Sequence, residues 1–227
     1  MSKQYPPANL PLIRLTRGQA IWVLKRLGYG DGVSPETFSE YIKSLLKLGI
    51  PFGRPYLKSP HGRRRWAHFG YFELMELALT LSLRVYHVVP DSVLNAIIDN
   101  RSKLRRIYCQ AYAERLSGKG AAMTLNIPGA PIKLRGCFLD LGMRFSGGQL
   151  IRFGPPRLLS PSEAVALSAQ RMRTSQTLLP VGLSTLAEGV AALAMAAPAV
   201  RSSPRKHVAQ RRTVRINERK TNTKSRG

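Results

Sequence analysis

The side chains of this chain that could do chemistry are polar and basic, and most gather around residues 34–48. Within this stretch, groups able to hydrogen-bond or carry charge recur at helical spacing: Thr37, Glu40, Lys43, Ser44 and Lys47. Arg17 precedes the stretch, and three adjacent arginines, Arg63, Arg64 and Arg65, follow it. Hydroxyl, carboxylate and ammonium groups can hydrogen-bond to base edges, while guanidinium groups bind phosphates. The chemistry indicated is binding.

No catalytic constellation stands out elsewhere in the sequence. Acidic residues are scarce, with no carboxylate pair and no Ser/His/Asp set. Gly147-Gly148 lacks the lysine and serine that follow in a phosphate-binding loop. Cys109 and Cys137 lie far apart and fit no zinc or redox spacing. We therefore expect a protein that is not an enzyme, with no cofactor and no metal.

The element that must position these side chains is a helix within Gly32–Phe52. Ser34 stands where an N-cap belongs, and Pro35 takes the first helical position, where its missing N–H costs nothing. An apolar stripe recurs at steps of three and four residues: Phe38, Tyr41, Ile42, Leu45 and Leu46. Gly49 ends the helix, and Pro51 prevents it from restarting. The sequence predicts a short capped helix with one free polar face.

Amphipathicity alone is typical of any surface helix, so the neighbouring segments decide the interpretation. Thr16–Leu27 is a second candidate helix, and the glycine-rich turn Gly28–Gly32 separates the two. Downstream, His61–Trp66 reads as the tip of an arginine-rich hairpin. Helix, turn, helix and basic hairpin is the order of a winged helix-turn-helix, whose second helix lies in the DNA major groove. Arg63–Arg65 would then grip phosphates, although an arginine run is also often merely solvated.

These segments resemble the DNA-binding domain of MerR-type regulators over Leu15–Leu116. That family has a Gly-Val-Ser-x-x-Thr recognition helix, matched at Gly32–Thr37, and an Ile-Pro exit, matched at Ile50-Pro51. Its wing ends in Arg-Arg-Tyr where this chain has Arg64-Arg65-Trp66. The glycine turn is longer than the family's, and so is the connection into the wing. The resemblance implies a DNA-binding domain followed by a helical pair, with Arg17 close to the phosphates.

Two further helices follow, Tyr71–Val88 and Asp91–Leu116. The apolar stripe of the second is close to a heptad seam, interrupted by Arg101. It could pack internally or form a dimer. We expect a homodimer, because a small domain gains specificity by pairing half-sites on DNA.

The character of the chain changes after Gly120. Short β-type runs appear at Thr124–Ile127, Ile132–Leu134, Cys137–Phe145 and Leu150–Phe153, and Ser160-Pro161 opens a helix that runs through Arg171. Val181–Val200 is apolar, but Ser184, Thr185, Glu188 and Gly189 interrupt it too much for a membrane span. We expect a small α+β region here, and no membrane partner.

Charge sets the last expectation. The chain has 36 basic and 12 acidic residues, a formal net charge of +24, which attracts polyanions. Its tail from Arg201 holds ten basic residues and one acidic residue without apolar periodicity, so it should be disordered and contact nucleic acid non-specifically. The predicted organisation is a flexible arm at 1–14, a winged helix-turn-helix at 15–89, a packing or dimerisation helix at 90–118, the α+β region at 119–200 and the basic tail at 201–227.

The fold class predicted is therefore mainly α with a β-wing. The function predicted is that of a sequence-specific protein for double-stranded DNA, cytoplasmic and nucleoid-associated, that regulates transcription. An excisionase-like DNA-bending protein of a mobile element would use the same helix and wing. An RNA-binding or ribosome-associated basic protein is the other alternative, although no aromatic pair is placed for base stacking.

Overall fold

The computed structural model describes residues 10–53, 68–87, 91–118, 120–127, 130–146, 149–173 and 180–199. The predicted wing arginines, Arg63–Arg65, and the tail from Arg201 lie outside these residues. So do most of the predicted N-terminal arm and the turn at Gly147-Gly148. The chain divides into two compact units, residues 1–197 and residues 198–227, and all the helices and strands named below belong to the first.

Helices dominate the described residues, and the strands form small antiparallel sheets. The helices are α1 Arg17–Arg26, α2 Pro35–Lys47, α3 Tyr71–His87, α4 Asp91–Asp99, α5 Arg101–Ser117, α6 Pro161–Arg173 and α7 Leu183–Met195. The strands are β1 Ala122–Ile127, β2 Ala130–Arg135, β3 Phe138–Asp140, β4 Met143–Ser146, β5 Gln149–Phe153, β6 Arg157–Leu159 and β7 Val181–Gly182. The prediction of a mainly α protein with minor β structure is confirmed at this level.

The starts of α1 and α2 follow from their capping residues. Thr16 and Gln19 form a capping box at α1: the Gln19 N–H donates to Thr16 Oγ1, and the Thr16 N–H donates to Gln19 Oε1. Ser34 Oγ accepts from the Thr37 N–H at 3.2 Å, as expected for an N-cap, and Pro35 opens α2. Both helices lie where the sequence predicts them.

The turn between α1 and α2 owes its shape to glycine and to one tyrosine. Gly28 and Gly32 have φ angles of 92° and 74°, in the left-handed region that other residues rarely adopt. Between them Tyr29 is buried, and its hydroxyl lies 2.5 Å from Ser82 Oγ on α3. The turn is therefore fastened to the central helix of the unit.

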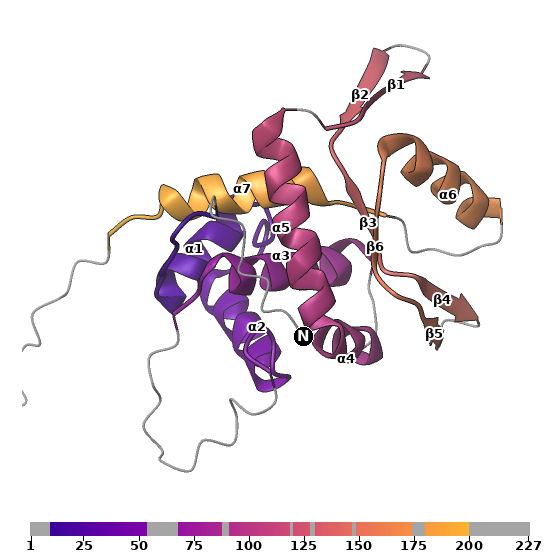
Figure 1. Ribbon diagram of the computed structural model, residues 1–227. Helices are drawn as coiled ribbons and strands as arrows, with labels where there is room; N and C mark the ends of the chain where they lie inside the picture. The colour runs from indigo at the N-terminus through magenta and orange to yellow at the C-terminus, as the bar shows by residue number, and fades with distance from the viewer. Residues whose placement is uncertain are drawn as a thin grey trace, which may run out of the picture. The chain divides into compact units, whose positions relative to one another are not determined.

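The core of the unit surrounds α3, which buries most of its length. Figure 1 shows α7 crossing this region, and α7 packs against α1, α3 and α5. Its buried residues include Leu183, Ala187, Val190 and Ala191. α7, which lies within the predicted apolar segment, thus supplies core surface. None of the described helices is long and apolar enough to cross a membrane.

One predicted element is wrong in its extent. Asp91–Leu116 is two helices, because α4 ends at Asp99 and Asn100, with φ −100° and ψ 12°, lies outside helical geometry. The Asn100 side chain turns back and donates to the Ala96 carbonyl at 3.0 Å. Arg101, which interrupts the apolar seam, begins α5 and points to α3. The break lets α4 and α5 pack in different directions, so no continuous coiled-coil seam exists.

Most of the apolar residues of α5 that predicted a dimer are covered by the chain itself, although Leu116 at its end is exposed. Leu104, Ile107, Tyr108 and Ala111 are all buried in the common core. This agrees with internal packing, the alternative role of the helix. A homodimer stays a prediction without support from this seam.

The predicted β runs are confirmed as strands, with one correction. β1 pairs with β2, β4 with β5, and β3 lies between β6 and β7. The run Cys137–Phe145 is divided into β3 and β4, because Gly142 has a φ of 62° and turns the chain between them. The helix predicted from Ser160-Pro161 is α6.

The predicted boundaries near residues 89 and 118 do not separate compact units. α7 comes from the predicted C-terminal region, yet it packs among the helices of the predicted DNA-binding domain. The sequence of α7 shows that it is apolar, but neither it nor the sequence of the N-terminal helices shows that the two pack together. The finer prediction, a winged helix-turn-helix, needs the wing, which lies outside the described residues.

Candidate nucleic-acid interface

The candidate interface is the outer face of α2. Its inner face buries Phe38, Ile42 and Leu45, each 1% exposed or less, so the orientation of the helix is fixed by packing. On the opposite side, Glu36, Thr37, Glu40 and Lys47 are exposed, and Lys43 and Ser44 are half-buried. Five of the predicted contact residues therefore share one accessible face: Thr37, Glu40, Lys43, Ser44 and Lys47.

Most of these side chains already have local partners. Thr37 Oγ1 lies 3.0 Å from Ser34 Oγ, and Ser44 Oγ donates to the Tyr41 carbonyl at 2.7 Å. Lys43 forms an ion pair with Glu40, and this hydrogen bond lowers the pKa of the Glu40 carboxyl. Exposed pairs of this kind are weak and exchange readily with water or another partner. The face can therefore offer both a donor and an acceptor to a ligand.

Arg17 is the first residue of α1, and its side chain reaches α2. Its Nη2 donates to both the carbonyl and the hydroxyl of Ser39, each at 3.1 Å. The side chain therefore fixes α2 relative to α1, a role that the sequence alone did not indicate. A phosphate contact by Arg17 stays a prediction, and so do the phosphate contacts of Arg63, Arg64 and Arg65.

An ion pair with a buried carboxylate holds the other end of α2, a role that no local sequence pattern indicated. Arg101 donates through Nε and Nη2 to the two carboxylate oxygens of Glu76, at 2.7 and 2.5 Å. The same Nη2 donates to the Gly49 carbonyl, just beyond α2, at 3.0 Å. Glu76 is 1% exposed, and burial raises the pKa of its carboxyl, although Arg101 opposes this shift. We call Glu76, Arg101 and the Gly49 carbonyl the α2 clamp.

Two more arginines brace the same region. Arg105, one turn after Arg101, donates to Glu73 at 2.9 Å and lies over the Phe72 ring. Arg84 lies over the Tyr41 ring of α2 and pairs with Asp91 of α4. A sequence signal existed for the pairing of these glutamates and arginines between α3 and α5. Glu73 and Glu76, three residues apart, interrupt the mostly apolar first half of α3, and Arg101 and Arg105, four residues apart, follow on α5.

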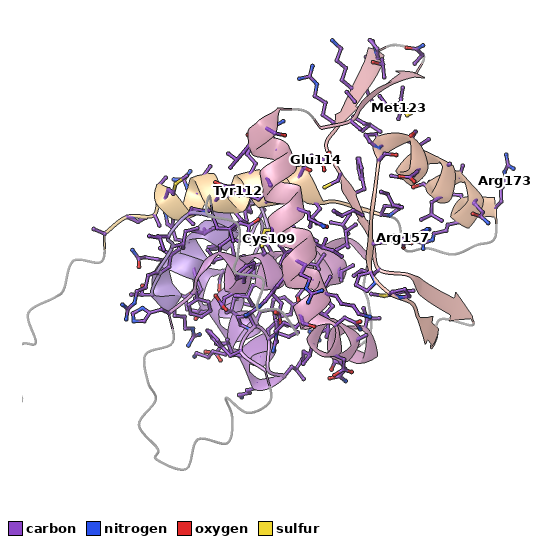
Figure 2. The ribbon with its side chains drawn as sticks, in the orientation of Figure 1. Cys109, Tyr112, Glu114, Met123, Arg157 and Arg173 are labelled. Atoms are coloured by element: carbon purple, nitrogen blue, oxygen red, sulfur yellow. The ribbon has the colours of Figure 1, made fainter. Side chains whose placement is uncertain are left out.

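A second buried ion pair lies in the strand region, away from α2. Asp140 accepts from Arg171 at 2.7 Å, from Arg157 at 3.2 Å and from the Gly142 N–H at 2.9 Å. Figure 2 labels Arg157, the first residue of β6. Burial opposes ionisation of Asp140, but these donors outweigh it and lower the pKa of the carboxyl. This cluster joins α6 to β3 and β6. Within it, the buried Asp140 carboxylate accepts from a buried guanidinium, Arg171, and from a largely exposed one, Arg157.

The thiols offer little reactivity. Cys137 is buried, its Sγ lies 3.1 Å from Ser184 Oγ, and burial raises its pKa to about 11. Cys109 lies along α5 with Tyr112 and Glu114, as Figure 2 shows, and burial raises its pKa as well. Nucleophilic thiols have lowered pKa values. Within the described ranges, no group of three or more His, Cys, Asp or Glu is placed to hold a metal ion.

Comparison with known proteins gives no relative. The chain matches no protein-family model, no curated protein and no solved structure. Its function therefore has to be argued from α2 and the contacts that hold it.

Proposed function

We propose that this protein binds double-stranded DNA sequence-specifically and regulates transcription, with α2 as the recognition helix in the major groove. The observation that carries the proposal is the way in which packing and hydrogen bonds fix α2 in the fold. The helix is packed on one face, fixed by Arg17 at one side and by the α2 clamp at its end, and polar on its outer face. Base readout requires such fixed side chains, because hydrogen bonds to base edges depend on direction.

The order of the elements supports the same conclusion. α1, a fastened turn and α2 follow one another as in a helix-turn-helix, and the N-terminal turn of α2 is exposed. Glu40 could accept from a cytosine amino group, and Lys43 could donate to guanine. Charge supports a polyanionic partner, since the chain carries +24 overall. In this proposal the basic tail from Arg201 adds phosphate contacts that carry no sequence information.

The test begins with selection of a preferred duplex from a random pool by the full chain. Lys43→Gln should then weaken binding to the preferred duplex by about 10-fold or more, which corresponds to a base contact of about 1–3 kcal/mol, and should weaken random duplex far less. Lys103→Gln is the matched control, because Lys103 is an exposed cation on α5. It should weaken both duplexes equally or not at all.

Two results would overturn the proposal. Selection that returns no preferred duplex would remove sequence specificity. Tighter binding to a structured RNA competitor than to any duplex would make the protein an RNA-binding one. A preferred duplex that is strongly bent in the complex, with no effect on a nearby promoter, would instead favour the excisionase-like alternative.

Deletion of Arg201–Gly227 should weaken binding to preferred and random duplexes by similar factors.

A further inference from the structure

The β1–β2 hairpin has two different faces. In an antiparallel pair, residues directly opposite each other share a face of the sheet. The register therefore puts Thr124 and Lys133 on one face, together with Ala122 and Arg135. The other face carries Met123 with Leu134 and Leu125 with Ile132. Polarity thus alternates across the whole hairpin.

Only the apolar face packs against another element. β1 packs against α6, and Met123, Leu125 and Leu134 are half-buried. On the polar face, Thr124, Asn126, Lys133 and Arg135 are all exposed. A two-stranded hairpin is marginal without a packed face, so its contact with α6 accounts for its order. The polar face contributes nothing to that packing.

The cations of the polar face have no acidic ion-pair partner among the described residues. Lys133 and Arg135 form no ion pair with any described residue, whereas other arginines of the unit pair with glutamate or aspartate. No acidic residue occurs from Leu116 to Leu139. Glu114, the nearest acid that precedes this segment, lies against Gly120 and Cys137. Uncompensated cations beside hydroxyl and amide groups match phosphate and sugar oxygens.

The hairpin and α2 lie at opposite ends of α5. The start of α5 lies at the end of α2, where Arg101 contacts the Gly49 carbonyl, and β1 follows the other end of α5. Figure 1 shows the hairpin beyond the end of α5 that is farther from α2 and α4. The 17 residues of α5 span about 25 Å. This length approaches one turn of duplex DNA, about 34 Å.

We propose that the polar face of the β1–β2 hairpin binds the phosphate backbone of duplex DNA in the flank about one turn from the bases that α2 reads. This inference rests on the proposed DNA-binding function. The contact is electrostatic, so it extends the footprint and increases affinity without adding base specificity.

The test compares two duplexes that both contain the preferred sequence, one of about one helical turn and one of about three turns. In salt titrations on the long duplex, K133Q/R135Q should flatten the slope of log affinity against log salt by about 1.8, about 0.9 per lost phosphate contact. On the short duplex its slope should equal that of the wild type. K133R/R135K keeps both charges and should restore the slope on the long duplex.

Ile132→Thr is the matched control, because Ile132 is on the same strand and on the other face of the hairpin, where its side chain is 47% exposed. It should leave both salt slopes unchanged. An unchanged slope for K133Q/R135Q on the long duplex would overturn the inference. Equal flattening on both duplexes would also overturn it, because the contact would then lie within the footprint of α2. If K133Q/R135Q weakened binding to structured RNA but not to duplex DNA, the partner of the polar face would be RNA and the flank contact would be rejected.

Failure of the inference and failure of the proposed function give different results. If Lys43→Gln abolishes sequence preference while the hairpin variants behave as wild type, only the flank contact is wrong. If no duplex is preferred at all, the role of α2 is wrong, whatever the hairpin variants do.

Discussion

α2 and the β1–β2 hairpin both present polar and basic side chains to solvent, but they are held in different ways. α2 buries an apolar stripe, is bonded to α1 through Arg17 and is anchored at its end by the α2 clamp. The hairpin rests on α6 through half-buried side chains only. The contrast is what the two proposed DNA contacts would require: base readout needs fixed geometry, whereas phosphate contact needs charge and tolerates movement.

The largest effect should come from breaking the α2 clamp. Arg101→Met leaves the Glu76 carboxylate buried without its guanidinium partner, so the free energy of unfolding should fall by about 3–5 kcal/mol in urea denaturation. Arg115→Met is the matched control, because Arg115 forms an exposed pair with Glu188. It should cause no clear loss. Equal stability of the two variants would show that the clamp does not hold α2.

A smaller effect should come from the strand region. Asp140→Asn keeps an acceptor for Arg171 but removes the charge that compensates it, so the free energy of unfolding should fall by about 1–3 kcal/mol. Because Asp140 joins α6 to β3 and α6 supports the hairpin, this variant should also reduce the salt slope on a long duplex. It should not change the ratio of affinities for preferred and random duplexes. A changed ratio would mean that the strand region affects base recognition by α2, so the two surfaces would not act independently.

Local elements could be predicted from the sequence because their signals are local. Ser34 and Pro35 mark the start of α2, Gly49 marks its end, and both boundaries match the structure. The β-type runs and the start of α6 were equally visible. Each depends on residues only a few positions apart, where capping and alternation act.

Long-range partners could not be predicted in the same way. Arg101 looked like a defect in a coiled-coil seam, yet it pairs with Glu76, 25 residues earlier, and contacts Gly49. The apolar segment that contains α7 is too interrupted for a membrane span and shows no partner in the sequence, yet α7 completes the core of helices that begin near residue 17. A pattern shows that a surface must be buried, but it does not show which distant segment covers it.

The smallest effect is in the pH dependence of stability, where the two buried carboxyls should act in opposite directions. Burial raises the pKa of Glu76, so the folded chain holds this proton more tightly than the unfolded chain. The free energy of unfolding should therefore decrease as pH rises from the ordinary glutamate value, about 4, through the folded pKa. Hydrogen bonds from Gly142, Arg171 and Arg157 outweigh burial and lower the pKa of Asp140. Its contribution is complete above the ordinary aspartate value and is lost as pH falls through the folded pKa.

Urea denaturation at a series of pH values separates the two contributions. Glu76→Gln should remove the decline with rising pH, and Asp140→Asn should remove the loss at low pH. The slope of the free energy against pH is the quantity to compare, because each substitution also changes stability by a constant amount. A wild-type slope in Glu76→Gln would mean that the pKa of Glu76 is the same in the folded and unfolded chains. The hydrogen bonds from Arg101 would then fully offset the burial of the carboxyl, and protonation of Glu76 would not change how firmly α2 is held.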